Sequence, residues 1–124
     1  MSDKDRLPLN SAVIQSFVVD ACGGDVELVL GMVDFFLKSA AGLALEMEAG
    51  LAAQNWPDVR RAAHSLKSSS RMFSADTLTQ LCLDTEKRAI DKEESGIAEL
   101  LPQIQAELAW LVTELPAFCR AMLA

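Results

Sequence analysis

The sequence contains no tyrosine, only one histidine and only three cysteines. The cysteines, Cys22, Cys82 and Cys119, form no CxxC pair, whereas a structural zinc site needs four cysteine or histidine ligands, usually at short spacings. We therefore expect no metal site. An odd number of cysteines scattered among apolar residues is typical of reduced, buried thiols in a cytoplasmic protein.

Long apolar runs, phosphate-binding glycine motifs and an excess of positive charge are missing as well. No apolar run reaches the ~18 residues needed to cross a bilayer, and the charged N-terminal residues are not followed by the apolar stretch of a signal peptide. The net charge of −7 argues against nucleic-acid binding, which needs a large face of Lys and Arg. The sequence has neither a P-loop nor a kinase Gly-rich loop. These absences predict a cytoplasmic protein that binds neither membrane nor nucleic acid and has no kinase activity of its own.

Signals for β-strands are scarce, and helical periodicity runs through almost the whole chain. The 124 residues fit one domain, 1–124, with its core at about residues 9–115. The predicted elements are one short helix and four longer ones, over residues 10–21, 25–53, 55–73, 74–94 and from a turn at 95–96 to 116. With short connections, these helices predict an all-α, antiparallel up-and-down four-helix bundle with a short N-terminal lid helix.

The expected helix ends rest on capping and breaking residues. Asn10 or Ser11 can cap the first helix, and Gly23-Gly24 should end it. Asp25, Asn55 and Ser74 are suitable N-caps for the next three helices. Pro116 should end or kink the last helix, because proline lacks a backbone N–H and clashes with the preceding turn. A short amphipathic tail is expected beyond it.

The single histidine, His64, lies in the predicted 55–73 helix. At about 100° per residue, small and apolar residues share one face of this helix: Val59, Ala62, Ala63, Leu66, Ser69, Ser70 and Phe73. His64 falls roughly opposite them, in a stripe with Arg60, Lys67 and Arg71. An exposed imidazole among cations is a place where an anion can be held.

His64 also has suitable chemistry for phosphoryl transfer. A neutral imidazole is a competent nucleophile near pH 7 and can meet a phosphoryl donor held by a partner. Because such transfer needs mainly positioning and charge stabilisation, Lys67, one turn further on, can neutralise charge on the transferred oxygens. Ser65 and Ser68 are small enough to let a partner approach closely. Arg60 and Arg71 are candidate docking residues.

The pattern around His64 resembles the histidine-containing phosphotransfer (HPt) family of bacterial, fungal and plant phosphorelays. The family pattern is A-H-x-L-K-G-S-S, followed by G-A about ten residues on and then L-x-x-L-C-x-x-x-E. The residues that carry the resemblance are Ala63-His64-Ser65-Leu66-Lys67-Ser68-Ser69-Ser70, then Ala75, Leu78, Leu81-Cys82 and Glu86. The resemblance covers roughly residues 9–115.

The resemblance implies a role for each matching residue. His64 matches the phosphorylated histidine, modified on the nitrogen that faces solvent, and Lys67 matches the lysine beside the phosphoryl group. Glu86 matches a position that in some members orients the imidazole. Ser68 stands where the family usually has Gly, so the docking of a partner should survive while partner choice or rate could change.

The resemblance further implies a monomeric phosphorelay intermediate, a phosphoprotein of two-component signal transduction. It would carry a phosphoryl group on His64 between aspartates of response-regulator receiver domains, including that of a hybrid sensor kinase. The chain lacks the paired acidic residues that hold Mg²⁺ in receivers, so no cofactor is expected on it and Mg²⁺ belongs to the partner.

Three other functions remain open at this point. An HPt-like module could bind receivers without being phosphorylated, and Ser68 is the hint for that reading. A helical enzyme could use His64 as a general base, which would require a concave pocket around it. A structural homodimer is the third.

Overall fold

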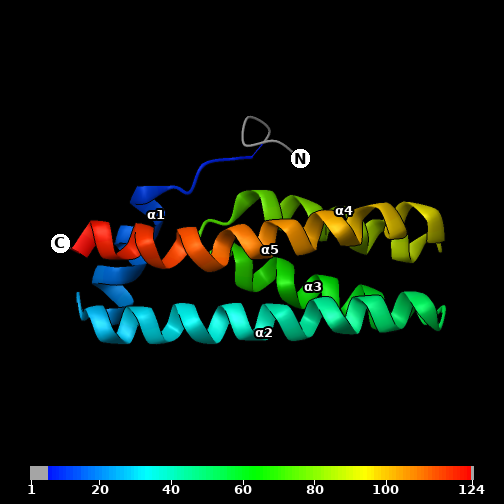
Figure 1. The fold of residues 1–124 in the computed structure, drawn as a ribbon, viewed down its shortest axis with the longest axis horizontal. Coiled ribbons are helices and arrows are strands. Elements are labelled where there is room, and N and C mark those ends of the chain that lie inside the picture. The colour runs from blue at the N-terminus through cyan, green and yellow to red at the C-terminus, as the bar shows by residue number, and fades with distance from the viewer. Residues whose placement is uncertain (1–5, 124) are drawn as a thin grey trace.

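Helices account for all the regular structure that the computed structural model, which describes residues 6–123, assigns to those residues. The elements are α1 (Ser11–Ser16), the π-helical turn η2 (Phe17–Ala21), α2 (Val26–Ala52), α3 (Trp56–Met72), α4 (Asp76–Ile90) and α5 (Glu94–Leu123). Figure 1 shows α2 to α5 side by side, each running opposite to the one before, with α1 at the end where α2 begins. The predicted all-α antiparallel bundle with a short N-terminal helix is confirmed. Residues 1–5 and 124 of the predicted domain lie outside the described residues.

The first three helices begin where their capping residues predict. Asn10, Asp25 and Asn55 each accept hydrogen bonds from backbone N–H groups of the first turn that follows. Gly23 and Gly24 end the first helix with φ angles of +60° and +76°, a region that favours glycine. The polypeptide therefore turns back into α2 at low conformational cost.

The boundary between α3 and α4 differs from the prediction at Ser74. Ala75 is the N-cap residue of α4, with no capping side chain, and Ser74 adopts a positive φ of +54°. The Ser74 hydroxyl instead accepts a hydrogen bond from the backbone N–H of Asn10, at 3.1 Å. A long-range contact thus takes the hydroxyl that local sequence assigned to a helix cap.

The last two helices also differ from the predicted boundaries. Helix α4 ends at Ile90, where Lys92 turns the chain with a φ of +56°, and residues 95–96 lie in the first turn of α5. Pro116 neither ends α5 nor leaves a separate tail, since the helix continues to Leu123. Leu115 and Cys119 are fully buried on either side of this proline. We attribute the continuation to their burial, which compensates for the backbone hydrogen bond that proline cannot make.

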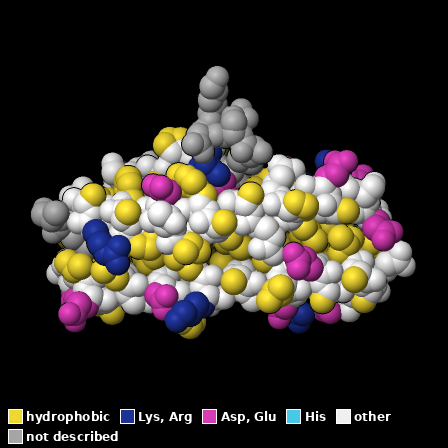
Figure 2. Space-filling model, in the orientation of Figure 1, with side chains coloured by type: hydrophobic (Ala, Val, Ile, Leu, Met, Phe, Trp, Pro, Cys, Tyr) yellow, Lys and Arg dark blue, Asp and Glu magenta, His cyan; other side chains and the backbone are white. Residues whose placement is uncertain are grey.

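The core is formed by the inner faces of α2 to α5, closed at one end by α1 and η2. Gly50 allows α2 and α3 to approach closely, because a Cβ there would lie 2.8 Å from Val59 Cγ2. All three cysteines are free and buried, as predicted. Figure 2 shows hydrophobic side chains along the boundary between α2 and α5, with charged side chains scattered on both sides.

Helix α2 is unusually apolar, although the sequence contains no uninterrupted apolar run long enough to cross a bilayer. Over an 18-residue window its mean hydropathy is 1.7, which by length and composition alone would suffice to cross a membrane. The core helix of a soluble bundle passes the same test. Here α2 packs against α3 and α5 and buries Val29, Phe36 and Met47, so this composition does not by itself indicate a membrane span.

The segment before α1 is fastened across α4 and α5 by specific polar contacts. Arg6 Nε donates to both carboxylate oxygens of Glu107, at 2.8 and 2.9 Å, and its guanidinium lies 4.2 Å from the ring centroid of Trp110. The Leu7 N–H donates to Thr77 Oγ1 at 2.6 Å. The side chains of Arg6 and Glu107 are only 9% and 3% exposed. Removal of Arg6 would therefore leave a buried carboxylate without this partner.

We predict that Arg6→Met lowers the free energy of unfolding by about 3 kcal/mol, because breaking a buried ion pair leaves an uncompensated charge. Chemical denaturation of both variants measures this. Replacing both partners, in Arg6→Met with Glu107→Gln, should restore part of the loss. Lys38→Met is the matched control, since its pair with Asp34 is exposed and its removal should cost less than about 1 kcal/mol. Equal losses for the buried and exposed pairs would contradict this account.

Candidate functional site

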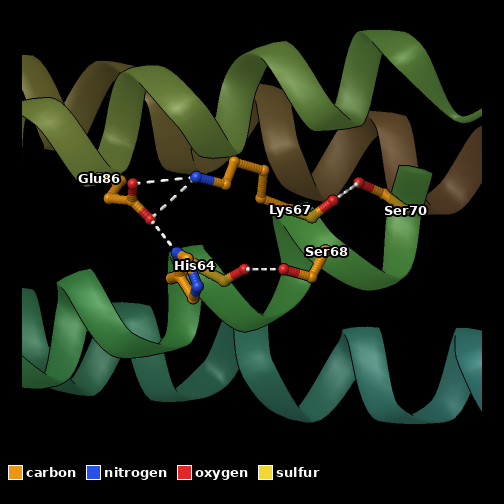
Figure 3. A network of polar contacts seen from close by, with 5 residues as sticks. All are labelled: His64, Lys67, Ser68, Ser70 and Glu86. Carbon is orange, nitrogen blue, oxygen red and sulfur yellow. Dashed lines mark hydrogen bonds and ion pairs between the residues drawn. The ribbon is translucent and has the colours of Figure 1, made fainter. Parts of the chain in front are cut away.

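His64 projects from the outer side of α3, where its side chain is 63% exposed. Figure 3 shows the imidazole turned toward Glu86, which comes from α4. His64 Nδ1 lies 2.8 Å from Glu86 Oε2. The other ring nitrogen, Nε2, has no hydrogen-bond partner among the described residues. The predicted exposure of His64 is confirmed, and one nitrogen is directed inward while the other is left free.

Lys67 does not share this exposed stripe, contrary to the sequence-based prediction. Its side chain is only 11% exposed, and Nζ donates to Glu86 Oε1 at 3.0 Å and to Oε2 at 3.4 Å. Helical periodicity alone predicts one buried face on α3, but α4 covers a second side of this helix. A lysine can bury its aliphatic stem along such a seam while its ammonium reaches a charged partner.

Glu86 is therefore the central acceptor of the site. It is bound by both His64 and Lys67, which lie one turn apart on α3 (Figure 3). Partial burial of its 15%-exposed side chain works to raise its pKa, but the hydrogen bonds and charges of Lys67 and His64 outweigh burial. The net effect places the pKa of Glu86 below its usual value of 4.5. The carboxylate is thus ionised near neutral pH.

This arrangement selects one tautomer of a neutral imidazole. An ionised carboxylate can only accept hydrogen bonds, so the contact at 2.8 Å requires the proton on His64 Nδ1. The lone pair then lies on Nε2, the nitrogen without a protein partner. The ring is accordingly held as a nucleophile that faces outward.

Serine hydroxyls around the histidine are mostly bound to their own helix. Ser68 Oγ donates to the His64 carbonyl at 3.1 Å, and Ser69 bonds similarly to the preceding turn. Ser70, which is buried, donates to the Lys67 carbonyl at 2.9 Å and lies 2.7 Å from Thr79 Oγ1 of α4. Ser70 thus links α3 to α4 beside Lys67, whereas Ser65 and Ser68 are exposed and small.

The two arginines that were predicted to bind a partner, Arg60 and Arg71, lie at different distances from His64. Arg60 lines an open depression of about 310 Å³ together with Pro57, Arg61 and His64. Arg61, which the sequence analysis did not select, also pairs with Asp58 at 3.0 Å. Arg71 is exposed two turns beyond His64, and no described contact joins it to His64 or Glu86. The structure therefore brings Arg60 beside the histidine but not Arg71.

An apolar groove between α2 and α3 is a feature that sequence reasoning missed. Its volume is about 460 Å³, and it continues the exposed side of α3 beyond Ser69 to Met72. Across the groove on α2 lies Phe35, with 73% of its surface exposed. The neighbouring Phe36 is buried, and the adjacency of two phenylalanines on one helix is the only signal in the sequence that one of them could be exposed.

The described residues contain no cluster of three potential metal ligands. Cys82, one turn before Glu86, is the nearest thiol. Burial raises the pKa of Cys82 to about 12, with the Glu86 carboxylate adding to the rise and Lys67 opposing it. This thiol is therefore protonated and packs as an apolar core residue.

Comparison with known proteins agrees with this geometry. The family model of the Hpt domain matches residues 31–115, which is more than half of the chain. The chain belongs to the Hpt domain family. No curated protein matched the sequence. Among solved structures, the fold is similar to histidine-containing phosphotransfer protein B (HptB) from Pseudomonas aeruginosa PAO1, with a TM-score of 0.77, 21% identity and coverage of 93% of each chain.

Membership of the Hpt family establishes a histidine phosphotransfer role in two-component signalling at the level of the family. Hpt domains are phosphocarriers, and response-regulator receiver domains are their general kind of partner. The roles of individual residues in this chain remain predictions.

The lowered pKa of Glu86 predicts a pH dependence of stability. Since folding favours the ionised carboxylate, its contribution is present above about pH 4.5 and is lost as the pH falls through the lower folded-state pKa. We expect Glu86→Gln to destabilise the protein near neutral pH and to lose most of that difference in the acid range. Urea denaturation of both proteins at several pH values measures it. A difference that stays constant with pH would contradict the ionised network.

Proposed function

We propose that this Hpt domain is a phosphorelay intermediate that carries a phosphoryl group on His64 Nε2 between aspartates of response-regulator receiver domains. The proposal rests chiefly on the geometry of His64, whose Nδ1 is bound to Glu86 while Nε2 faces outward, with no partner among the described residues. Such a nitrogen can reach the active site of a partner without any movement of the bundle.

The chemistry needs no proton transfer by this chain. The Nε2 lone pair attacks the phosphorus of the receiver's aspartyl phosphate, a bond from Nε2 to phosphorus forms, and the bond to the aspartate oxygen breaks. The aspartate leaves as a carboxylate, and the imidazole, which keeps its Nδ1 proton, acquires a positive charge. Glu86, already 2.8 Å from Nδ1, stabilises that charge. The reverse sequence of bond changes passes the group to a second receiver.

Lys67 and the partner supply the remaining charge. The resemblance assigns Lys67 to neutralise the transferred oxygens, and its ammonium lies in the same network as His64. The Mg²⁺ that the reaction uses is expected on the receiver, and no cofactor is expected on this chain. In this proposal the chain is a cytoplasmic monomer without kinase activity of its own.

The surface around His64 fits a protein partner rather than a small substrate. The nearest depression is open and basic, with Arg60 and Arg61, and the apolar groove begins about 8 Å along α3, at Ser69. An interface of ordinary size, about 800 Å² on each partner, spans both. We expect the receiver to cover His64 and to contact Phe35 in this groove. The interface would then combine charge attraction at the arginines with burial of apolar surface in the groove.

The strongest test is phosphorylation. Incubation with a phosphorylated receiver should place acid-labile, base-stable phosphate on the protein, and His64→Gln should abolish it. The exposed His64 contributes little to folding, so the variant should change the free energy of unfolding by no more than about 0.5 kcal/mol, as measured by thermal unfolding. Undiminished labelling of the variant would disprove the site.

The same experiment separates this function from its main alternative. A module that binds receivers without being phosphorylated would show receiver binding, for example by calorimetry, and no phosphate on the wild-type protein. An enzyme with His64 as general base is less consistent with the structure, because His64 lines an open depression whose other residues are Pro57, Arg60 and Arg61. That reading would require turnover of a small substrate without any receiver.

Ser68 allows a test of where the receiver docks. It is exposed one turn after His64, and its hydroxyl is turned back to the His64 carbonyl. Ser68→Gly should transfer phosphate as fast as wild type or faster, at a cost of less than ~1 kcal/mol in helix stability. Ser68→Gln should slow transfer strongly because its side chain occupies the approach to Nε2. Rates from one phosphorylated receiver, with helicity by circular dichroism as the control, decide this. If Ser68→Gln transfers phosphate at the wild-type rate, the receiver does not dock over this part of α3.

A further inference from the structure

Lys67 is placed to act on His64 before any phosphoryl group is present. Its ammonium is 3.0 Å from Glu86 Oε1, while Oε2 of the same carboxylate receives His64 Nδ1 at 2.8 Å. Figure 3 shows dashed lines from the Glu86 carboxylate to both side chains. The contact between lysine and histidine is therefore indirect, through the two oxygens of one carboxylate.

We propose that Lys67 is a positioning residue, which fixes the orientation and charge of Glu86 and thereby sets the tautomer of His64. This inference rests on the proposed function of His64 for its biological meaning. It is distinct from charge stabilisation of the phosphoryl group, because it operates in the resting protein.

The geometry around Glu86 supports this role in two ways. Lys67 is only 11% exposed, and Ser70 binds its backbone carbonyl at 2.9 Å while touching Thr79 of α4, so the start of the lysine side chain is fixed relative to α4. A glutamate side chain has three rotatable bonds. The lysine ammonium lies closer to Oε1, at 3.0 Å, than to Oε2, at 3.4 Å, and this contact holds the carboxylate so that Oε2 faces Nδ1. Without Lys67, the carboxylate could rotate away or accept a proton more readily.

Replacement of Glu86 by its amide analogue, glutamine, should reverse the tautomer of His64. An amide has one accepting oxygen and one donating NH₂ group, and an ammonium can bind only the oxygen. In the Glu86→Gln variant, Lys67 should therefore hold the amide oxygen and direct NH₂ toward Nδ1. This would move the imidazole proton to Nε2, the opposite of the wild-type tautomer.

The experiment measures the two tautomers of His64 directly in the unphosphorylated protein. His64 is the only histidine of the chain, so the ring nitrogens of ¹⁵N-labelled protein give one unambiguous set of NMR signals. The spectra are recorded at a pH where the ring is neutral. Lys67→Met, which keeps an apolar stem of similar length, should lower the ratio of Nδ1–H to Nε2–H by about five-fold, in keeping with a weakened charge-assisted hydrogen bond.

Three variants serve as controls. Arg60→Met removes another cation next to His64 that has no described contact with Glu86, and it should leave the ratio unchanged. Lys67→Arg keeps a positive donor and should recover much of the wild-type ratio. Combined with Glu86→Gln, Lys67→Met should no longer lower the ratio and should raise it, because the amide is then free to turn its oxygen toward Nδ1.

These results separate the inference from its rivals. A fall in the ratio with Lys67→Met that disappears or reverses in the Glu86→Gln background supports action through Glu86. An unchanged ratio in Lys67→Met, or an equal fall in both backgrounds, overturns it. Because the measurement needs no phosphate, a failure of His64 to accept phosphate would refute the proposed relay function and leave this result readable.

Discussion

The Glu86 carboxylate is the interaction on which the rest of the site depends. It joins α4 to two residues one turn apart on α3, binding the imidazole with one oxygen and the ammonium with both. A single acceptor therefore couples the nucleophile to the nearest buried cation. Since the pKa of Glu86 is held below its usual value, the coupling persists at neutral pH.

This coupling requires that α3 and α4 keep their relative position. Ser70 and Thr79 connect them beside Lys67, and the segment before α1 holds the beginning of α4 through Thr77 and Ser74. Arg6 extends the same segment to Glu107 of α5. Residues far from His64 in the sequence thus fix the helix that carries its partner, Glu86.

The exposed side of the site, by contrast, is incomplete without a partner. His64 Nε2 faces outward, and the surface beyond it offers arginines on one side and an apolar groove with Phe35 on the other. The chain thus presents an oriented imidazole on an exposed helix. In the proposed relay, the phosphoryl donor, the metal ion and the shielding from water would come from the receiver. This division explains how a domain of one bundle can serve a transfer reaction with so few residues of its own.

Much of the fold was predictable, because it depends on local rules. Periodicity predicted the helices, and the short connections predicted their antiparallel arrangement. Asn10, Asp25 and Asn55 marked three of the helix beginnings. The pattern around His64 also identified the family and the exposed histidine. These features follow from residues within one helix or one turn, where backbone geometry relates spacing to position.

Tertiary structure decided the features that depend on which elements meet. Lys67 lies buried because α4 covers a second side of α3, and Phe35 lies exposed because no element covers that side of α2. Ser74 binds the N-terminal segment in place of capping a helix. Helix α5 continues past Pro116, where Leu115 and Cys119 are buried on either side of the proline. The sequence alone therefore determined the fold class and the exposed histidine, whereas packing between helices decided the tautomer of that histidine and its surroundings.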